Sequence, residues 1–184
     1  MNKIGTKEIG TSRLILRRFT MDDAQDMFDN WASDPEVTKF LTWPAHPNVD
    51  VTRMVLESWI PQYEDGGFFQ WVIVWKETGK AVGNISVVKL NEQTDAAEIG
   101  YCLSRALWGR GVMTEALKAV MAYLFGEAGL NRVAAYHDAR NPASGRVMEK
   151  AGMKLEGILR QAGKNNQGLC DDVWHAALRS EWKG

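Results

Sequence analysis

The sequence lacks clustered cysteines and long apolar runs, and each absence excludes a class of protein. Its two cysteines, Cys102 and Cys170, have no CxxC spacing, so neither a disulfide framework nor a zinc site is expected. No apolar run approaches the roughly 18 residues of a membrane span, and the first residues lack the apolar segment of a signal peptide. We therefore expect a soluble, cytoplasmic protein with no metal and no membrane partner.

The sequence also lacks an excess of charge of either sign. The formal net charge is -1 at pH 7, which argues against the broad phosphate-binding face of nucleic-acid proteins. Any anion site must therefore be local. With 184 residues, of which 45% are hydrophobic, the chain can bury one good core. We expect a single domain over residues 1–184.

Apolar periodicity predicts a mixed order of elements. Strands are predicted over residues 12–19, 68–75, 81–90, 96–103, 132–137, 155–160 and 172–178, and helices over about 20–35, 51–63, 113–125 and 142–151. A parallel nucleotide-binding fold would alternate strand and helix from the beginning. This order instead predicts an α/β protein of the α+β type, with a mixed, mainly antiparallel central sheet of about seven strands flanked by about four helices.

A glycine-rich loop lies directly before the helix predicted over residues 113–125. In it Gly109 and Gly111 flank Arg110, and Thr114 follows in the first helical turn. A helix start carries unpaired N–H groups and a partial positive charge, so it binds phosphate where no bulky side chain blocks the approach. The alternative is a tight turn between strand and helix. The loop fits neither the dinucleotide GxGxxG pattern nor a GKS or GKT triphosphate loop.

Four further stretches are distinctive in their order and spacing: TSRLILRRFTMDDA, EIGYCLSRALWGRGVMTEAL, ARNPASGRVMEKAGMKLEGILR and DDVWHAALRSEW. Together they cover nearly the whole chain and resemble the GNAT superfamily of N-acetyltransferases, which depend on acetyl-coenzyme A (acetyl-CoA). The similar branch is that of the ribosomal-protein N-terminal alanine acetyltransferases. The resemblance implies the GNAT fold, acetyl-CoA as cosubstrate and a primary amine as acceptor, foremost the α-amine of a protein, peptide or amino acid.

The resemblance also implies a coenzyme site. In that family the loop Q/R-x-x-G-x-G/A turns its backbone N–H groups onto the coenzyme diphosphate. Here Trp108 stands where Gln or Arg is usual, and Met113 stands where a small residue is usual. The implied coenzyme-binding residues are Leu103, Trp108, Gly109, Arg110, Gly111, Val112, Met113, Thr114, Asn141 and Ser144.

Acetyl transfer to an amine needs a neutral nitrogen, a polarised thioester carbonyl and a proton for the leaving thiolate. Glu98 is the only acid in the strand over residues 96–103, and it shares a face with Gly100 and Cys102. We consider Glu98 a candidate base acting through water; the alternative is a structural ion pair or a solvated strand end. Tyr101, on the other face, is a candidate proton donor, with a core aromatic as the alternative.

Two residues at the start of the helix over residues 142–151 complete the candidate site. By the resemblance, Asn141 hydrogen-bonds the pantetheine arm and Ser144 protonates or orients the leaving thiolate. The alternative is an ordinary helix N-cap with a first-turn hydroxyl. Neither His137 nor His175 belongs to a nucleophile triad pattern.

The acceptor side is less defined. The resemblance implies that residues 31–46 and 163–168 shape the acceptor groove. Phe40 and Trp43 either line this groove or pack the helices onto the sheet. Asp172 either helps to shape the groove or is a solvated strand residue. Two other functions remain open: acetylation of a polyamine or an aminated antibiotic, and a non-catalytic acetyl-CoA sensor. The chain is expected to be a monomer or a homodimer.

Overall fold

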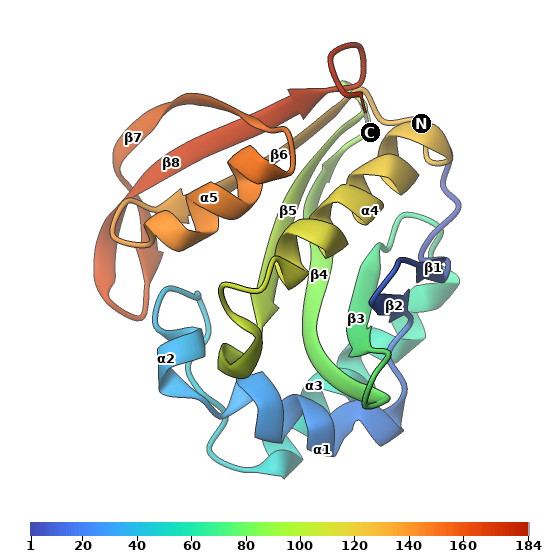
Figure 1. The fold of residues 1–184 in the computed structure, drawn as a ribbon, viewed down its shortest axis with the longest axis vertical. Coiled ribbons are helices and arrows are strands. Elements are labelled where there is room, and N and C mark those ends of the chain that lie inside the picture. The colour runs from blue at the N-terminus through green and yellow to red at the C-terminus, as the bar shows by residue number, and fades with distance from the viewer. Residues whose placement is uncertain (184) are drawn as a thin grey trace.

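The computed structural model describes residues 1–183, which form one eight-stranded sheet in the order β1-β2-β3-β4-β5-β6-β8-β7 (Figure 1). All neighbouring strands are antiparallel except β5 and β6. The strands are β1 (Ile9–Gly10), β2 (Leu14–Arg17), β3 (Gln70–Trp75), β4 (Lys80–Asn91), β5 (Ala96–Leu103), β6 (Arg132–Asp138), β7 (Lys154–Asn165) and β8 (Gly168–Leu178). The α-helices are α1 (Ala24–Met27), α2 (Pro35–Thr38), α3 (Val49–Trp59), α4 (Val112–Gly126) and α5 (Pro142–Lys150). The predicted mixed, mainly antiparallel α+β fold is confirmed.

The largest departure from the predicted elements is in the first helical region. It is not one helix over residues 20–35 but the short α1 followed by a π-helical segment, Phe28–Ala32. Pro35 begins α2 and does not end a helix, because its fixed φ suits the first helical position. Asp34 caps α2 by accepting from the Glu36 N–H at 2.9 Å.

Helices cover both faces of the sheet and bury two cores. In Figure 1, α4 crosses in front of β4 and β5. Apolar residues of α4, among them Leu117, Val120 and Met121, pack on this face together with Ile99 and Leu103 of β5. On the other face, α1, the π-helical segment and α3 pack around Cys102. Successive residues of β5 therefore point to opposite cores, as predicted. Among residues 1–183, no helix is both long enough and apolar enough to cross a membrane.

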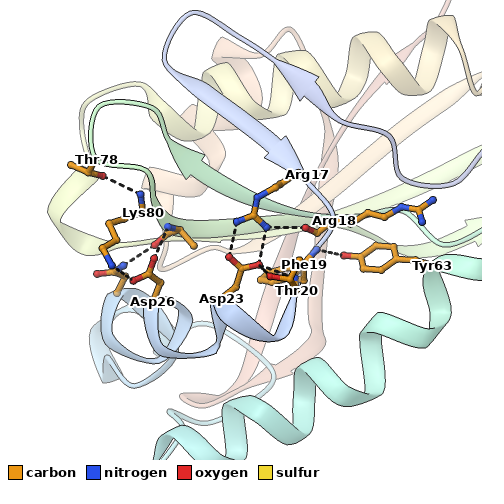
Figure 2. A network of polar contacts seen from close by, with 11 residues as sticks. Arg17, Arg18, Phe19, Thr20, Asp23, Asp26, Tyr63, Thr78 and Lys80 are labelled. Atoms are coloured by element: carbon orange, nitrogen blue, oxygen red, sulfur yellow. Dashed lines mark hydrogen bonds and ion pairs between the residues drawn. The ribbon is translucent and has the colours of Figure 1, made fainter.

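Polar contacts fix the chain between β2 and α1 (Figure 2). The Arg17 guanidinium donates to both carboxylate oxygens of Asp23, at 2.8 and 2.7 Å. Asp23 also accepts from the Thr20 N–H at 2.8 Å, and the Phe19 N–H donates to the Tyr63 hydroxyl at 2.9 Å. These contacts hold the start of α1 close to the end of β2.

β5 and β6, the only parallel neighbours in the described sheet, separate along their length. They pair over three positions, the last of which joins Glu98 to Ala134. Beyond this pair β5 continues to Leu103 beside β4, while β6 continues to Asp138 beside β8. Within residues 1–183, the edge of β5 that faces away from β4 therefore has no strand partner after Glu98.

Candidate active site

A cavity of about 390 Å³ lies beside this unpaired part of β5. Residues from both faces of the strand line it, because Tyr101 belongs to the α4 side and Cys102 to the α1 side. It is lined by Tyr101, Cys102 and Leu103 of β5; Leu107, Trp108, Gly109, Gly111, Val112, Met113 and Thr114 of the next loop and α4; Asn141, Ala143, Ser144, Arg146, Val147 and Lys150 at α5; and Glu36, Val37, Lys39, Phe40 and Leu41 around α2.

The loop before α4 presents backbone N–H groups at one end of the cavity. Gly109 and Gly111 have φ of +73° and +72°, a conformation in which glycine alone is free of steric cost. Gly111 is the N-cap of α4, and among residues 1–183 no side chain caps this helix start. The first-turn N–H groups and the positive end of the helix dipole together favour an anion here.

Two side chains of this loop have structural contacts. The Trp108 indole N–H donates to the Leu103 carbonyl at 2.9 Å, although the residue is 48% exposed. Arg110 does not line the cavity: its guanidinium lies 5.5 Å from the centre of the Trp75 ring. Direct binding of the diphosphate by the Arg110 side chain therefore stays a prediction. The backbone of Arg110 is part of the loop.

Tyr101 and Ser144 meet across the cavity wall. The tyrosine hydroxyl donates to the Ser144 carbonyl at 3.0 Å and lies 2.9 Å from the Ser144 hydroxyl. A hydroxyl has one proton, so in this arrangement the serine donates to the tyrosine. Burial raises the pKa of Tyr101, which keeps it protonated at neutral pH. Both protons are used within the pair in this arrangement, so the Ser144 hydroxyl must rotate before it can donate to a group in the cavity.

Asn141 stands at the N-cap position of α5, yet within the described chain no side-chain hydrogen bond caps this helix. Its backbone N–H donates to the Asp138 carbonyl at 2.7 Å, and the residue lines the cavity. Asn141 is thus the N-cap residue by position, but its side chain does not make the hydrogen bond of an ordinary cap. A pantetheine-binding role for the Asn141 amide stays a prediction that this geometry favours.

Glu98 lies outside the cavity lining, at the last residue pair that joins β5 to β6. It is on the sheet face of Cys102, opposite Tyr101, as predicted. Burial raises the pKa of Glu98; Lys89 lowers it in part, and Asp172 raises it further. Asp172 is only 5% exposed, so the alternative of a solvated strand residue is wrong for it. A carboxylate of raised pKa suits a base that works near neutral pH.

The two predicted acceptor regions contact each other. Asn166, in the turn between β7 and β8, donates its backbone N–H to the Leu41 carbonyl at 3.1 Å. Its side-chain amide donates to the carbonyls of Thr38 and Trp43, both at 2.8 Å. The segment after α2, which contributes Phe40 to the cavity, is thus held by the β7–β8 turn. Trp43 is outside the lining and packs beside His46.

Comparison with known proteins identifies this arrangement. Residues 13–154 match the family described as an acetyltransferase (GNAT) domain. The chain belongs to the GNAT acetyltransferase family. It is 30% identical over 174 residues to the uncharacterized N-acetyltransferase p20 of Bacillus licheniformis, covering 95% of this chain and 97% of that protein. It is also 32% identical over 148 residues to the putative ribosomal N-acetyltransferase YdaF of Bacillus subtilis, covering 79% and 80%.

A solved structure described as a probable acetyltransferase shares the fold of this GNAT protein, with a TM-score of 0.86 at 26% identity over 96% of this chain and 99% of the other. The predicted GNAT fold is confirmed. The family also confirms the predicted enzyme class, an N-acetyltransferase that uses acetyl-CoA.

The sequence did not single out three charged residues of this GNAT cavity: Lys39, Arg146 and Lys150. Glu36, one of the carboxylates that a polyamine site would need, also lines it. Arg146 and Lys150 are four residues apart on α5, and this spacing could have placed them on one helix face. The positions of Glu36 and Lys39 depend on the tertiary contacts of α2. Among residues 1–183, no group of three His, Cys, Asp or Glu residues could hold a metal ion.

Proposed function

We propose that this GNAT protein transfers the acetyl group of acetyl-CoA to the α-amine of a protein, peptide or amino acid, by direct attack in a ternary complex. The observation that carries the proposal is the composition of the cavity beside β5. This cavity joins an uncapped helix start, a hydroxyl pair and the segment after α2, and residues from both faces of β5 line it. Donor and acceptor can therefore meet from opposite sides of the strand.

The coenzyme follows the wall of α4 and α5. Its diphosphate binds the N–H groups at Gly109, Gly111 and the first turn of α4. Its pantetheine amides pair with the free edge of β5 beyond Glu98, in the manner of an added strand, and with the Asn141 side chain. The thioester then lies beside the hydroxyls of Tyr101 and Ser144.

In the reaction the neutral amine nitrogen attacks the thioester carbonyl carbon. The C–N bond forms, the C–S bond breaks, and the thiolate takes a proton from the Ser144–Tyr101 pair, which regains a proton from water. The nitrogen loses its extra proton through water to Glu98. An α-amine has a pKa of about 7.7 to 8, against about 10.4 for lysine, so it needs only a weak base of this kind.

The acceptor is tested by thiol release from acetyl-CoA. One set of peptides has free Ala, Ser or Thr N-termini; the matched set has blocked N-termini and an internal lysine; a third set contains polyamines. We expect release with free N-termini only. The similarity to YdaF, which is described as a putative ribosomal N-acetyltransferase, supports this class of acceptor. Release with polyamines alone would replace the proposal, and coenzyme binding without release from any set would favour the sensor.

The Glu98→Gln variant tests the base. Because the carboxylate is the active form and its pKa is raised, kcat should fall in the wild type as the pH drops through that raised pKa. The variant should lose this limb of the pH profile and about 10-fold or more in kcat. The measurement is kcat between pH 5 and 9, with Glu57→Gln on the exposed side of α3 as control. Identical profiles in all three proteins would reject Glu98 as the base.

A further inference from the structure

Arg13 reaches from the start of β2 to the coenzyme loop, far away in the sequence. Its guanidinium Nη1 donates to the Arg110 carbonyl at 2.9 Å. Nη2 would lie 3.7 Å from a Cβ placed on Gly111. Arg13 does not line the cavity, so its contacts with the loop lie outside the cavity.

Arg13 is itself fixed by Glu115, in the first turn of α4. Its side-chain Nε donates to Glu115 Oε2 at 2.6 Å, and its backbone N–H donates to Oε1 at 2.9 Å. The hydroxyls of Thr11 and Ser12 donate to the same Oε1, at 2.6 and 2.9 Å. Burial alone would raise the pKa of Glu115, but these hydrogen bonds outweigh it and lower the pKa to about 2.

Trp75 completes the cluster. The guanidinium carbons of Arg13 and Arg110 lie 5.6 and 5.5 Å from the centre of its ring. Both cations are thus within the range of attraction to the indole face. The loop is held through the backbone and the side chain of Arg110 at once.

The contacts of Arg13 offset two effects that would otherwise weaken diphosphate binding by the loop. Gly109 and Gly111 leave the backbone free in many conformations, and ordering it on binding would cost conformational entropy. Glu115 places a negative charge in the helix turn where the diphosphate is proposed to bind, which would repel it. A guanidinium that bonds both the Arg110 carbonyl and Glu115 fixes the backbone and offsets the charge.

We propose that Arg13 is a positioning residue of the coenzyme site: it holds the Gly109–Gly111 loop in its diphosphate-binding conformation and neutralises Glu115. The inference rests on the proposed binding of the acetyl-CoA diphosphate to this loop. It assigns the opening TSRL stretch of the chain a role in coenzyme affinity.

The first test is the affinity of the Arg13→Met variant for acetyl-CoA, measured by calorimetry. Methionine keeps part of the apolar stem but removes the charge and the donors, so the Kd should rise about 10-fold or more. Arg13→Lys keeps the charge without the planar fork and should give an intermediate Kd. In steady state the KM for acetyl-CoA should rise, while kcat at saturating acetyl-CoA and the KM for the acceptor stay unchanged.

The Arg13→Met/Glu115→Gln double variant separates positioning from general destabilisation. It removes the uncompensated carboxylate that the single Arg13→Met variant leaves beside the diphosphate. It should therefore bind acetyl-CoA more tightly than Arg13→Met alone, although it loses more hydrogen bonds. A role confined to stability predicts the opposite order.

Arg17→Met is the matched control, because Arg17 is at the end of β2, close to Arg13 in the sequence, and its guanidinium also pairs with a carboxylate, that of Asp23, away from the loop (Figure 2). It should change stability but not the Kd. A wild-type Kd for both Arg13 variants, or an equal rise in the Arg17 control, would overturn the inference and leave the proposed function intact. Failure of the wild-type protein to bind acetyl-CoA would overturn both.

Discussion

Replacement of Gly111 by valine is expected to weaken acetyl-CoA binding by about 10-fold or more, because the left-handed conformation costs a non-glycine residue roughly 1–2 kcal/mol and about 1.4 kcal/mol is a factor of ten. Gly111 has a φ of +72°, and the nearest atom to an added Cβ is Arg13 Nη2 at 3.7 Å. The effect is therefore one of backbone strain and not of a clash. To relieve it, the loop must rotate, and its N–H groups then turn away from the diphosphate. Calorimetry with acetyl-CoA measures the loss.

Gly129→Val is the control for this strain. Gly129 has a φ of +70°, and an added Cβ there would lie 3.9 Å from its nearest neighbour, Asn2 Nδ2. Gly129 follows the C-terminal end of α4, whereas the loop precedes its N-terminal end. The length of α4 at about 1.5 Å per residue separates the two by about 20 Å. The Gly129→Val variant should lose comparable stability and keep its affinity for acetyl-CoA. Unchanged affinity in Gly111→Val, or an equal loss in both variants, would contradict the assignment of the loop.

Elements whose burial is set by their own periodicity could be predicted from the sequence. The apolar stripe of α4, with Leu117, Val120 and Met121, is fully buried against the sheet. The alternation in β5 placed Tyr101 and Cys102 on opposite faces, because side chains of a strand alternate whatever its partners are. The same local rule identified the glycine pair before α4, since it depends on adjacent residues only.

Contacts between distant segments could not be predicted in this way. Glu115 is a charged residue in the first turn of α4, yet only 18% of its side chain is exposed, because residues more than a hundred positions earlier surround it. The Arg110 side chain is directed to Trp75 by a strand that the loop's own sequence does not specify. The position of Phe40 in the cavity depends on Asn166, from the other end of the chain. The backbone conformation of the site is therefore set by local sequence, whereas the positions of its charged side chains are set by tertiary contacts.

The leaving-group step has the other large expected effect. Ser144→Ala should lower kcat by about 100-fold, since a positioned proton donor contributes about that much, while the Kd for acetyl-CoA stays close to the wild-type value. Tyr101→Phe should also lower kcat, because its hydroxyl bonds both the carbonyl and the hydroxyl of Ser144. Thiol release at saturating acetyl-CoA and acceptor measures kcat, and calorimetry measures the Kd.

The Tyr101→Phe/Ser144→Ala double variant tests whether the two hydroxyls act as one relay. If the serine delivers its proton only while the tyrosine holds it in place, the double variant should be no slower than the slower single variant. If the fold-losses in kcat of the two single variants multiply in the double variant, the two hydroxyls act as independent donors. Tyr123→Phe controls for loss of a buried hydroxyl, because Tyr123 donates to the Gly5 carbonyl at 2.6 Å outside the cavity lining. Its kcat should stay at the wild-type value, and wild-type rates in both single variants would remove the pair from the mechanism.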